Sequence, residues 1–349
     1  HKGPGIGHKL RRELWLSQVA NGPGMTPGPG KPAALARNAI LPAMPERCAK
    51  LSLLLALVLS AGACAAPAEQ PEFVYVEVPF LTNRATKVNG AGALRFTTDI
   101  AATTGGRCEL SVYEMPDAEV VVDRYRALPV NEALDLLAPG DSQRVTMYVH
   151  GYNIGLERAC RDAAVLARRT GFEGRTVLFS WPASRTIVTY RKDERRFADS
   201  MPQIVAALDE LGRRHGRQNV NIVTHSMGSR IVLEAIESLD TGDEKFGDLV
   251  LIAPDIDREA FVEVLPDLKR IVEDITVLVS DDDRLLLLSQ TVNLGARLGQ
   301  SGGEIDGVDI IDVTEVDDAG FGGHVYHLTD ENVGRVIGGI LDGKAGSPA

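Results

Sequence analysis

One stretch, residues 219–230, constrains the fold more than any other part of the sequence. It begins with the β-branched residues Val220, Ile222 and Val223, which are typical of a strand buried in a sheet. The run breaks at residues 225–228, after which apolar residues return at helical spacing: Val232, Ala235, Ile236 and Leu239. The stretch therefore predicts a strand, a sharp turn and a helix, in that order.

Ser226 stands at the tip of the predicted turn. A serine in this context, followed two residues later by Gly228, has the pattern of a nucleophile elbow, in which the turn lifts Oγ clear of the sheet. Gly228 keeps a side chain out of the tight approach between turn and helix. Thr224 replaces the first glycine of the usual pattern, and we expect it to crowd the turn. The alternative is an ordinary strand–helix turn with a capping serine, and the preceding strand favours the elbow.

Strands alternate with helices along much of the remaining sequence. This alternation predicts an α/β fold with a mostly parallel central sheet flanked by helices, in which polar residues gather at the carboxyl ends of the strands. The predicted strands are 73–78, 109–113, 145–149, 176–181, 220–224, 249–253, 275–280 and 308–313. The predicted helices centre on 132–137, 159–167, 204–211, 232–239, 285–298 and 331–341, and the charge run 191–196 is interpreted as a loop or a helix start.

The first 64 residues differ in composition from the rest. Residues 1–43 are rich in glycine and proline without periodicity, which predicts a disordered or non-native extension upstream of a start at Met44. Residues 44–64 combine a basic start, an apolar core and small residues before Cys64, the pattern of a signal peptide of secretory or lipoprotein type. We therefore expect one domain over 65–349 in an exported protein, either periplasmic, extracellular or lipid-anchored to the outer envelope at Cys64.

Cysteine usage and charge indicate the compartment of the protein and the partners that it can bind. Only Cys108 and Cys160 follow the signal region, and an oxidising compartment permits a disulfide between them, the alternative being two buried thiols. Residues 1–64 hold eight of the 37 basic and two of the 48 acidic residues, which leaves the rest of the chain with a formal charge of −17. A surface this acidic excludes nucleic acid as an expected partner. The sequence contains no dinucleotide fingerprint, phosphate loop or metal-binding spacing, so we expect neither a cofactor nor a metal.

Several polar clusters lie where predicted strands end, and together they make the chain resemble a known superfamily. From about Phe73 to Leu341 the chain resembles the α/β-hydrolase superfamily, and more closely a bacterial esterase/lipase-like family known only as a domain of unknown function. The motifs that carry it are Val149-His150-Gly151-Tyr152-Asn153, Phe179-Ser180-Trp181-Pro182, Thr224-His225-Ser226-Met227-Gly228, Ala253-Pro254-Asp255-Ile256-Asp257, Asp283-Arg284 and Gly323-His324-Val325-Tyr326.

The resemblance implies a catalytic triad in the chain order nucleophile, acid, histidine. Ser226, Asp283 and His324 meet that order. The acid has alternatives: Asp281 or Asp282 beside Asp283, and Asp255 or Asp257 one strand earlier, of which Asp255 is the main competitor. Two other histidines are not assigned to catalysis, because His225 should point away from the serine across the turn and His327 is interpreted as structural.

The backbone N–H of Met227 is expected to be the first oxyanion donor, and that of Tyr152 or Asn153 the second. These residues predict a secreted serine hydrolase that acts on small-molecule carboxylic esters. The alternative is a non-catalytic envelope protein that keeps the fold as a binding or interaction module.

Overall fold

The computed structural model describes residues 73–90, 94–113, 120–138, 143–183, 190–293, 295–300, 302–316 and 322–344. The expectations for residues 1–43 and 44–64, and the lipid anchor at Cys64, lie outside these ranges. The described residues belong to one compact unit that begins at Glu72. No helix in the described ranges is both long and apolar enough to cross a membrane.

Nine strands in the described ranges form one sheet. They are β1 (Phe73–Val88), β2 (Leu94–Tyr113), β3 (Val120–Leu128), β4 (Val145–Val149), β5 (Arg175–Ser180), β6 (Val220–His225), β7 (Leu249–Ile252), β8 (Ile275–Val279) and β9 (Asp309–Asp312). Their order across the sheet is β3-β2-β1-β5-β4-β6-β7-β8-β9. The pairs β1–β2 and β2–β3 are antiparallel, and the other neighbours are parallel. The predicted mostly parallel sheet is confirmed.

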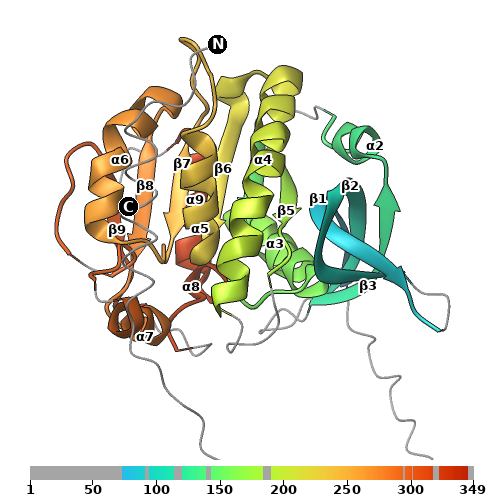
Figure 1. The fold of residues 1–349 in the computed structure, drawn as a ribbon, viewed down its shortest axis with the longest axis horizontal. Coiled ribbons are helices and arrows are strands. Elements are labelled where there is room, and N and C mark those ends of the chain that lie inside the picture. Colours follow the sequence, from blue (N-terminus) through green and yellow to red (C-terminus); the bar gives the residue numbers. More distant parts are fainter. Residues whose placement is uncertain are drawn as a thin grey trace, which may run out of the picture. The chain divides into compact units, whose positions relative to one another are not determined.

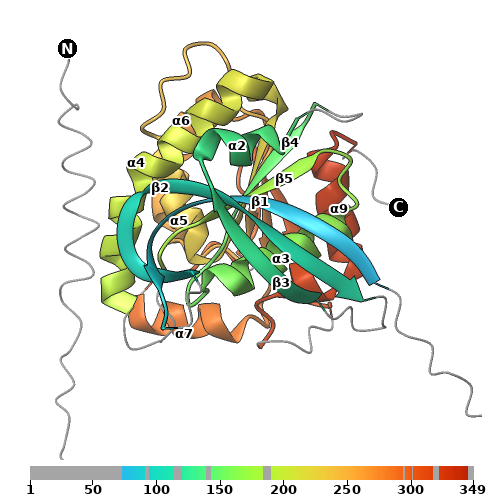
Figure 2. The ribbon, with the colours of Figure 1, turned by 90° about the vertical axis from the view of Figure 1, so that its right-hand side faces the viewer.

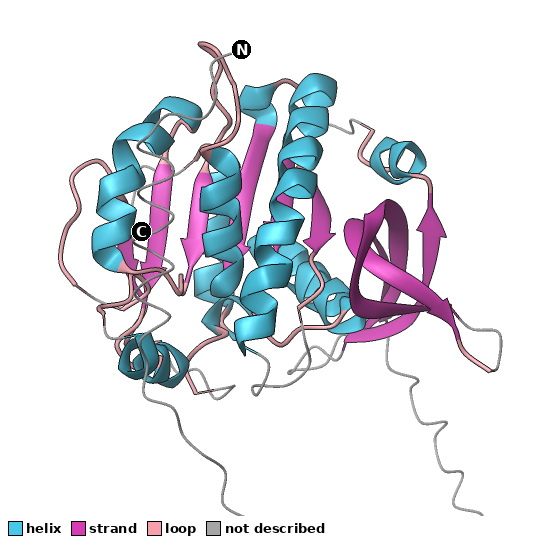
Figure 3. Ribbon diagram, in the orientation of Figure 1, coloured by secondary structure: helices cyan, strands magenta, loops and turns pink. Residues whose placement is uncertain are grey.

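Helices cover both faces of the sheet (Figure 3). They are α2 (Val130–Asp135), α3 (Leu156–Thr170), α4 (Tyr190–His215), α5 (Met227–Ile236), α6 (Arg258–Ile271), α7 (Arg284–Asn293), α8 (Tyr326–Thr329) and α9 (Glu331–Leu341), with a 3₁₀ turn at Arg217–Asn219. In Figure 2, α4 and α6 lie on one side of the sheet, whereas α3 and α9 lie on the other. The carboxyl ends of the central strands point towards α7 and α8 (Figure 1).

The apolar pattern of the central strands explains this layering. β4, β6, β7 and β8 are buried along their whole length, as expected for parallel strands covered on both faces. Successive side chains of a strand point to opposite faces. Ile222 accordingly packs with the helices α4 and α5, and Val223 packs with α3 and α9. The polar residues that follow these strands are thereby delivered to a single edge of the sheet.

The structure differs from the sequence-based expectation mainly in the N-terminal part of the sheet. β1 and β2 are much longer than predicted, and β3 was not predicted at all. The charges of β3 explain the omission, because Arg124 and Arg126 form ion pairs with Glu109 on the neighbouring strand. Such a cross-strand cluster has no local signature. The charge run 191–196 lies inside α4, which agrees with a helix start rather than a loop.

Cys108 of β2 and Cys160 of α3 form a disulfide, with their Cα atoms 6.1 Å apart. Both cysteines are fully buried. The bridge ties the antiparallel part of the sheet to the helix that follows β4. Of the two alternatives left by the sequence, the structure therefore contains the bridged form.

Removing this bridge should weaken the fold. The cysteines are 52 residues apart, and closing a loop of that length restricts the unfolded chain by up to about 4 kcal/mol. We expect the double variant Cys108→Ala/Cys160→Ala to lose about 2–4 kcal/mol of unfolding free energy in a urea titration. Alkylation of the unreduced wild-type domain, followed by intact-mass measurement, is the control, and two reactive thiols would contradict the bridge.

Candidate active site

The turn after β6 has the geometry expected of a nucleophile elbow. β6 ends at His225, α5 begins at Met227, and Ser226 between them has φ 53° and ψ −125°. A non-glycine residue held in such a conformation is strained by about 1–3 kcal/mol and persists only where its surroundings enforce it. The N–H of Ser226 donates to the carbonyl of Ile252 on β7, at 2.9 Å. The neighbouring strand thus helps to hold the turn.

The residues on either side of Ser226 explain how the turn packs against the end of β4 and the start of α5. A Cβ atom at Gly228 would lie 2.5 Å from the carbonyl oxygen of His150, so only glycine allows α5 to approach the end of β4. Thr224 is buried, and its hydroxyl forms a 2.8 Å hydrogen bond with that of Ser229 on α5. The threonine therefore links the strand to the following helix.

Asp283 and His324 are brought together by two different segments. Nδ1 of His324 lies 2.5 Å from Oδ2 of Asp283, and both side chains are buried. The other carboxylate oxygen of Asp283 accepts hydrogen bonds from the N–H groups of Leu285 and Leu286, both at 3.0 Å, and so caps α7. One carboxylate thus starts a helix and orients an imidazole. Since a carboxylate only accepts, neutral His324 carries its proton on Nδ1 and leaves the Nε2 lone pair free to act as a base.

The competing aspartates have other surroundings. Asp255 accepts hydrogen bonds from Ser289 at 2.6 Å and from Nε of Arg297 at 2.8 Å, and neither a hydrogen bond nor an ion pair joins it to His324. Burial alone would raise the pKa of Asp255, but the charges of Arg297 and Arg230 hold it below its ordinary value. Asp257 caps α6. Asp281 and Asp282 are exposed.

The loop that carries His324 is held by buried side chains of the strands and of α8. Nε2 of His225 lies 2.9 Å from the carbonyl oxygen of His324. Burial, followed by the neighbouring His327 and His324, lowers the pKa of His225 well below its ordinary value, so its neutral ring donates to that carbonyl. The hydroxyl of Tyr326 donates to the carbonyl of Leu278 at 3.0 Å and accepts from the N–H of Ala253 at 2.9 Å.

These contacts agree with part of the sequence interpretation and add to it. The sequence analysis expected His225 to point away from the serine; the structure bonds its ring to the carbonyl of His324, a positioning role that the sequence did not reveal. His327 is buried and packs against His225 with ring centroids 4.5 Å apart, and burial lowers its pKa to about 3. Gly323 has φ 82°, and a Cβ there would lie 2.7 Å from the carbonyl oxygen of Asp282, which explains the glycine before His324.

One contact of the expected triad is not made. Ser226 and His324 are 7% and 6% exposed and lie at the same edge of the sheet, but no hydrogen bond joins these two described side chains. In unliganded sites a catalytic hydrogen bond is often long and tightens only when the substrate binds. The structure does join His324 to two other parts of the site. Its ring is bonded to Asp283, and its carbonyl accepts a hydrogen bond from His225, the last residue of β6.

The loop after β4, residues 150–155, lies directly against Ser226 and is called the oxyanion loop below. A Cβ atom at Gly151 would be 3.0 Å from Cβ of Ser226. Tyr152 and Asn153 follow, and Asn153 has φ 58°, a left-handed conformation that asparagine tolerates better than most residues. The N–H of Met227 belongs to the first turn of α5, where backbone N–H groups have no partner within the helix.

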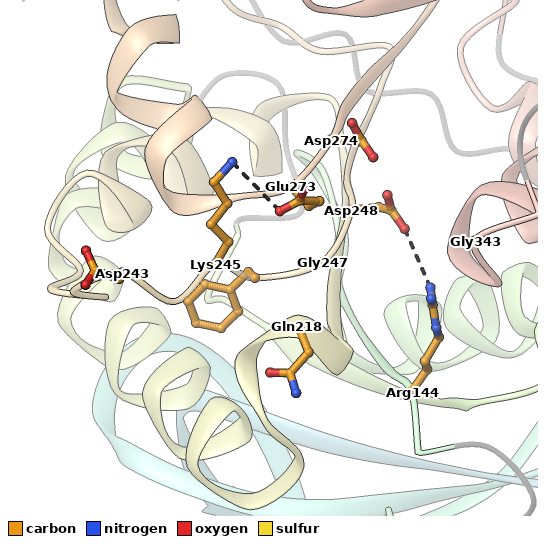
Figure 4. A pocket seen from close by; sticks show the side chains of 10 residues that line it. Arg144, Gln218, Asp243, Lys245, Gly247, Asp248, Glu273, Asp274 and Gly343 are labelled. Atoms are coloured by element: carbon orange, nitrogen blue, oxygen red, sulfur yellow. Dashed lines mark ion pairs between the residues drawn. The ribbon is translucent and has the colours of Figure 1, made fainter.

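A hollow of about 540 Å³ lies at the opposite, amino-terminal edge of the sheet (Figure 4). Its lining includes Arg144, Lys245, Asp248 and Glu273, of which Arg144 faces Asp248 and Lys245 faces Glu273. Burial and the neighbouring Asp274 raise the pKa of Asp248 to about 6. None of the predicted site residues lines this hollow. Among the described residues, no group of three or more His, Cys, Asp and Glu could hold a metal ion.

Residues 131–339 match a protein family described as alpha/beta hydrolase of unknown function (DUF900). The chain belongs to this family. In this alpha/beta hydrolase the matched segment runs from α2 to α9 and includes Ser226, Asp283 and His324, whereas β1, β2 and β3 precede it. The fold class and the family resemblance predicted from the sequence are therefore confirmed.

Solved structures of other hydrolases are also similar to this alpha/beta hydrolase, at low identity. The structure of EstE5-PMSF is 13% identical over 68% of this chain and 81% of that chain, with a TM-score of 0.40. A predicted CIB-like hydrolase from Thermoplasma acidophilum is 12% identical over 78% and 100% of the two chains, with a TM-score of 0.36. A hyperthermophilic esterase from Pyrobaculum calidifontis is 13% identical over 80% and 87%, with a TM-score of 0.36. None of the curated proteins compared with this chain matches it.

Proposed function

We propose that this alpha/beta hydrolase is a serine hydrolase that cleaves small-molecule carboxylic esters. Ser226 attacks the ester carbonyl, His324 takes the serine proton at Nε2 and returns it to the leaving alcohol, and Asp283 stabilises the imidazolium that forms. Water then attacks the acyl-enzyme with the same histidine as base. The observation that carries the proposal is the buried 2.5 Å contact between His324 and Asp283, at the edge of the sheet where the strained Ser226 stands.

The developing oxyanion requires donors beside Ser226. We assign the first to the N–H of Met227, at the positive N-terminal end of α5, and the second to that of Tyr152 or Asn153 in the oxyanion loop. The approach of Gly151 to Ser226 brings this loop next to the attacked carbonyl. Two segments distant in sequence would thereby share the charge.

A fluorophosphonate probe tests the nucleophile directly. Wild-type protein should become covalently labelled, and Ser226→Ala should not, because the probe reacts only with a serine activated by a base. Ser229→Ala is a matched control, since Ser229 is a buried serine on α5, three residues after Ser226, whose hydroxyl is bonded to Thr224. Equal labelling of wild type and Ser226→Ala would refute the assigned nucleophile. An unlabelled wild type that binds ligands would favour the non-catalytic binding module.

We further propose that the hydrolase acts outside the cytoplasm. The signal-like pattern of residues 44–64 supports export, and so does the disulfide, since such bridges persist mainly in oxidising compartments. A lipid anchor at Cys64 belongs to the same proposal.

A further inference from the structure

Arg84 is a buried arginine of β1 that joins two loops at the carboxyl edge of the sheet. It is 2% exposed, and its Nη2 donates to the carbonyl of Ile154 at 2.8 Å. Its Nη1 donates to the carbonyl of Ala183 at 3.4 Å. Ile154 belongs to the oxyanion loop after β4, and Ala183 follows β5. One guanidinium therefore fixes both loops where they leave neighbouring strands.

A second path leads from the same guanidinium to the start of the oxyanion loop. Nε of Arg84 lies 3.1 Å from Oγ of Ser180, which in turn lies 3.1 Å from Nε2 of His150. Nδ1 of His150 lies 2.8 Å from the carbonyl oxygen of Gly151. A guanidinium only donates and a carbonyl only accepts, so each bond has one direction: Arg84 donates to Ser180, Ser180 to His150, and His150 to Gly151.

The relay needs a neutral imidazole, because Nε2 of His150 must accept a hydrogen bond. Burial, followed by the charge of Arg84, lowers the pKa of His150 to about 3, so the ring is neutral at ordinary pH. Trp181 stacks against this ring and donates its Nε1–H to the carbonyl of His150 at 2.8 Å. The ring is thus held by its hydrogen bonds and by the indole.

Tyr152 and Asn153 lie between the two carbonyls that Arg84 controls. Arg84 bonds the carbonyl of Ile154 directly. It holds the carbonyl of Gly151 through Ser180 and His150. Gly151 also lies against Ser226. The backbone N–H groups assigned to the oxyanion hole therefore belong to a segment fixed at both ends.

We propose that Arg84 is a positioning residue for the oxyanion hole, which sets the N–H groups of Tyr152 and Asn153 relative to Ser226. The proposal rests on the proposed function and adds to it a residue that precedes the segment matching the family. Arg84 acts through the loop and touches no reacting atom. Because a misplacement of about 1 Å can lower a rate about 100-fold, the placement of this loop matters for turnover.

Kinetics of Arg84→Met and Arg84→Lys on a soluble ester test the proposal. We expect kcat to fall about 100-fold with little change in KM, since the lost interaction strengthens only in the transition state. Lysine should not restore the rate, because a point charge cannot hold both loops as the planar fork does. Ser180→Ala cuts only the relay to Gly151 and should lower kcat about 10-fold, the equivalent of one hydrogen bond.

Arg144→Met is the matched control. Arg144 precedes β4 at the opposite edge, where it donates to the carbonyl of Leu341 at 3.0 Å. Its loss should affect stability and leave kcat near the wild-type value. Amide hydrogen exchange of residues 151–154 supplies a readout independent of activity: exchange should accelerate in Arg84→Met and Ser180→Ala and remain unchanged in Arg144→Met.

The outcomes separate this proposal from the function on which it rests. Wild-type kcat and exchange in both Arg84→Met and Ser180→Ala would overturn the role of Arg84 while leaving the hydrolase intact. A wild type that neither hydrolyses esters nor reacts with the fluorophosphonate would refute the function, and exchange would still decide whether Arg84 fixes the loop. If Arg84→Met fails to fold, Ser180→Ala, which removes one hydroxyl, provides the same two measurements.

Discussion

Replacing Asp283 with asparagine is expected to lower kcat by about 10⁴-fold and to leave the protein folded. Oδ1 of Asp283 caps α7, and an asparagine oxygen can still accept those two N–H groups. The amide nitrogen would face Nδ1 of His324 and could not accept its proton. The variant therefore removes the orientation and charge stabilisation of the imidazole while it keeps the helix cap.

Asp282→Asn is the control for this variant, because Asp282 is the exposed neighbour in the same turn. Turnover, a thermal unfolding curve and the circular dichroism spectrum should be compared for the three proteins. We expect Asp282→Asn to resemble wild type in all of them. Turnover of Asp283→Asn within tenfold of wild type would show that the acid is another residue.

The elbow could be predicted because all of its signals are local. The β-branched run before Ser226, the glycine after it and the helical spacing beyond Arg230 lie within about twenty residues and specify strand, turn and helix together. The structure places β6, the strained serine and α5 on those residues. The chain order of Ser226, Asp283 and His324 came from the family resemblance, and the structure brings the last two into contact.

Contacts between distant segments could not be predicted from the sequence. Arg84 is 70 residues from Ile154 and 99 from Ala183, and nothing beside it in the sequence identifies a buried arginine. The hydrogen bond from His225 to the carbonyl of His324 could not be predicted for the same reason, because the two residues are 99 positions apart in the sequence. The roles of Arg84 and His225 follow from the segments that they bond, and which segments lie beside them depends on the order of the strands in the sheet.

The sequence also leaves Asp255 and Asp283 as rivals, because both follow a buried strand and precede a helix. Their partners in the structure differ. Asp255 faces the guanidinium of Arg297, whereas Asp283 faces an imidazole. We therefore propose that Asp255 has a structural role and that Asp283 supports proton transfer by His324.

Asp255→Asn should accordingly give the opposite result to Asp283→Asn. The Asp255 and Arg297 side chains are only 8% and 5% exposed, so neutralising the carboxylate leaves a buried guanidinium without its counter-charge. We expect about 3 kcal/mol of unfolding free energy to be lost, which corresponds to a midpoint roughly 10 °C lower. Measured below that midpoint, kcat should stay within about tenfold of wild type, because the carboxylate forms its bonds with Ser289 and Arg297 and not with His324.

Glu273→Gln is the matched control for the loss of an ion pair. Glu273 and Lys245 lie 3.8 Å apart with side chains 66% and 37% exposed, and such surface pairs contribute at most about 1 kcal/mol. Urea titrations of the three proteins should therefore separate Asp255→Asn from both wild type and Glu273→Gln. If Asp255→Asn instead abolished turnover without loss of stability, and Asp283→Asn kept it, the acid would lie after β7 and the contact between Asp283 and His324 would be structural.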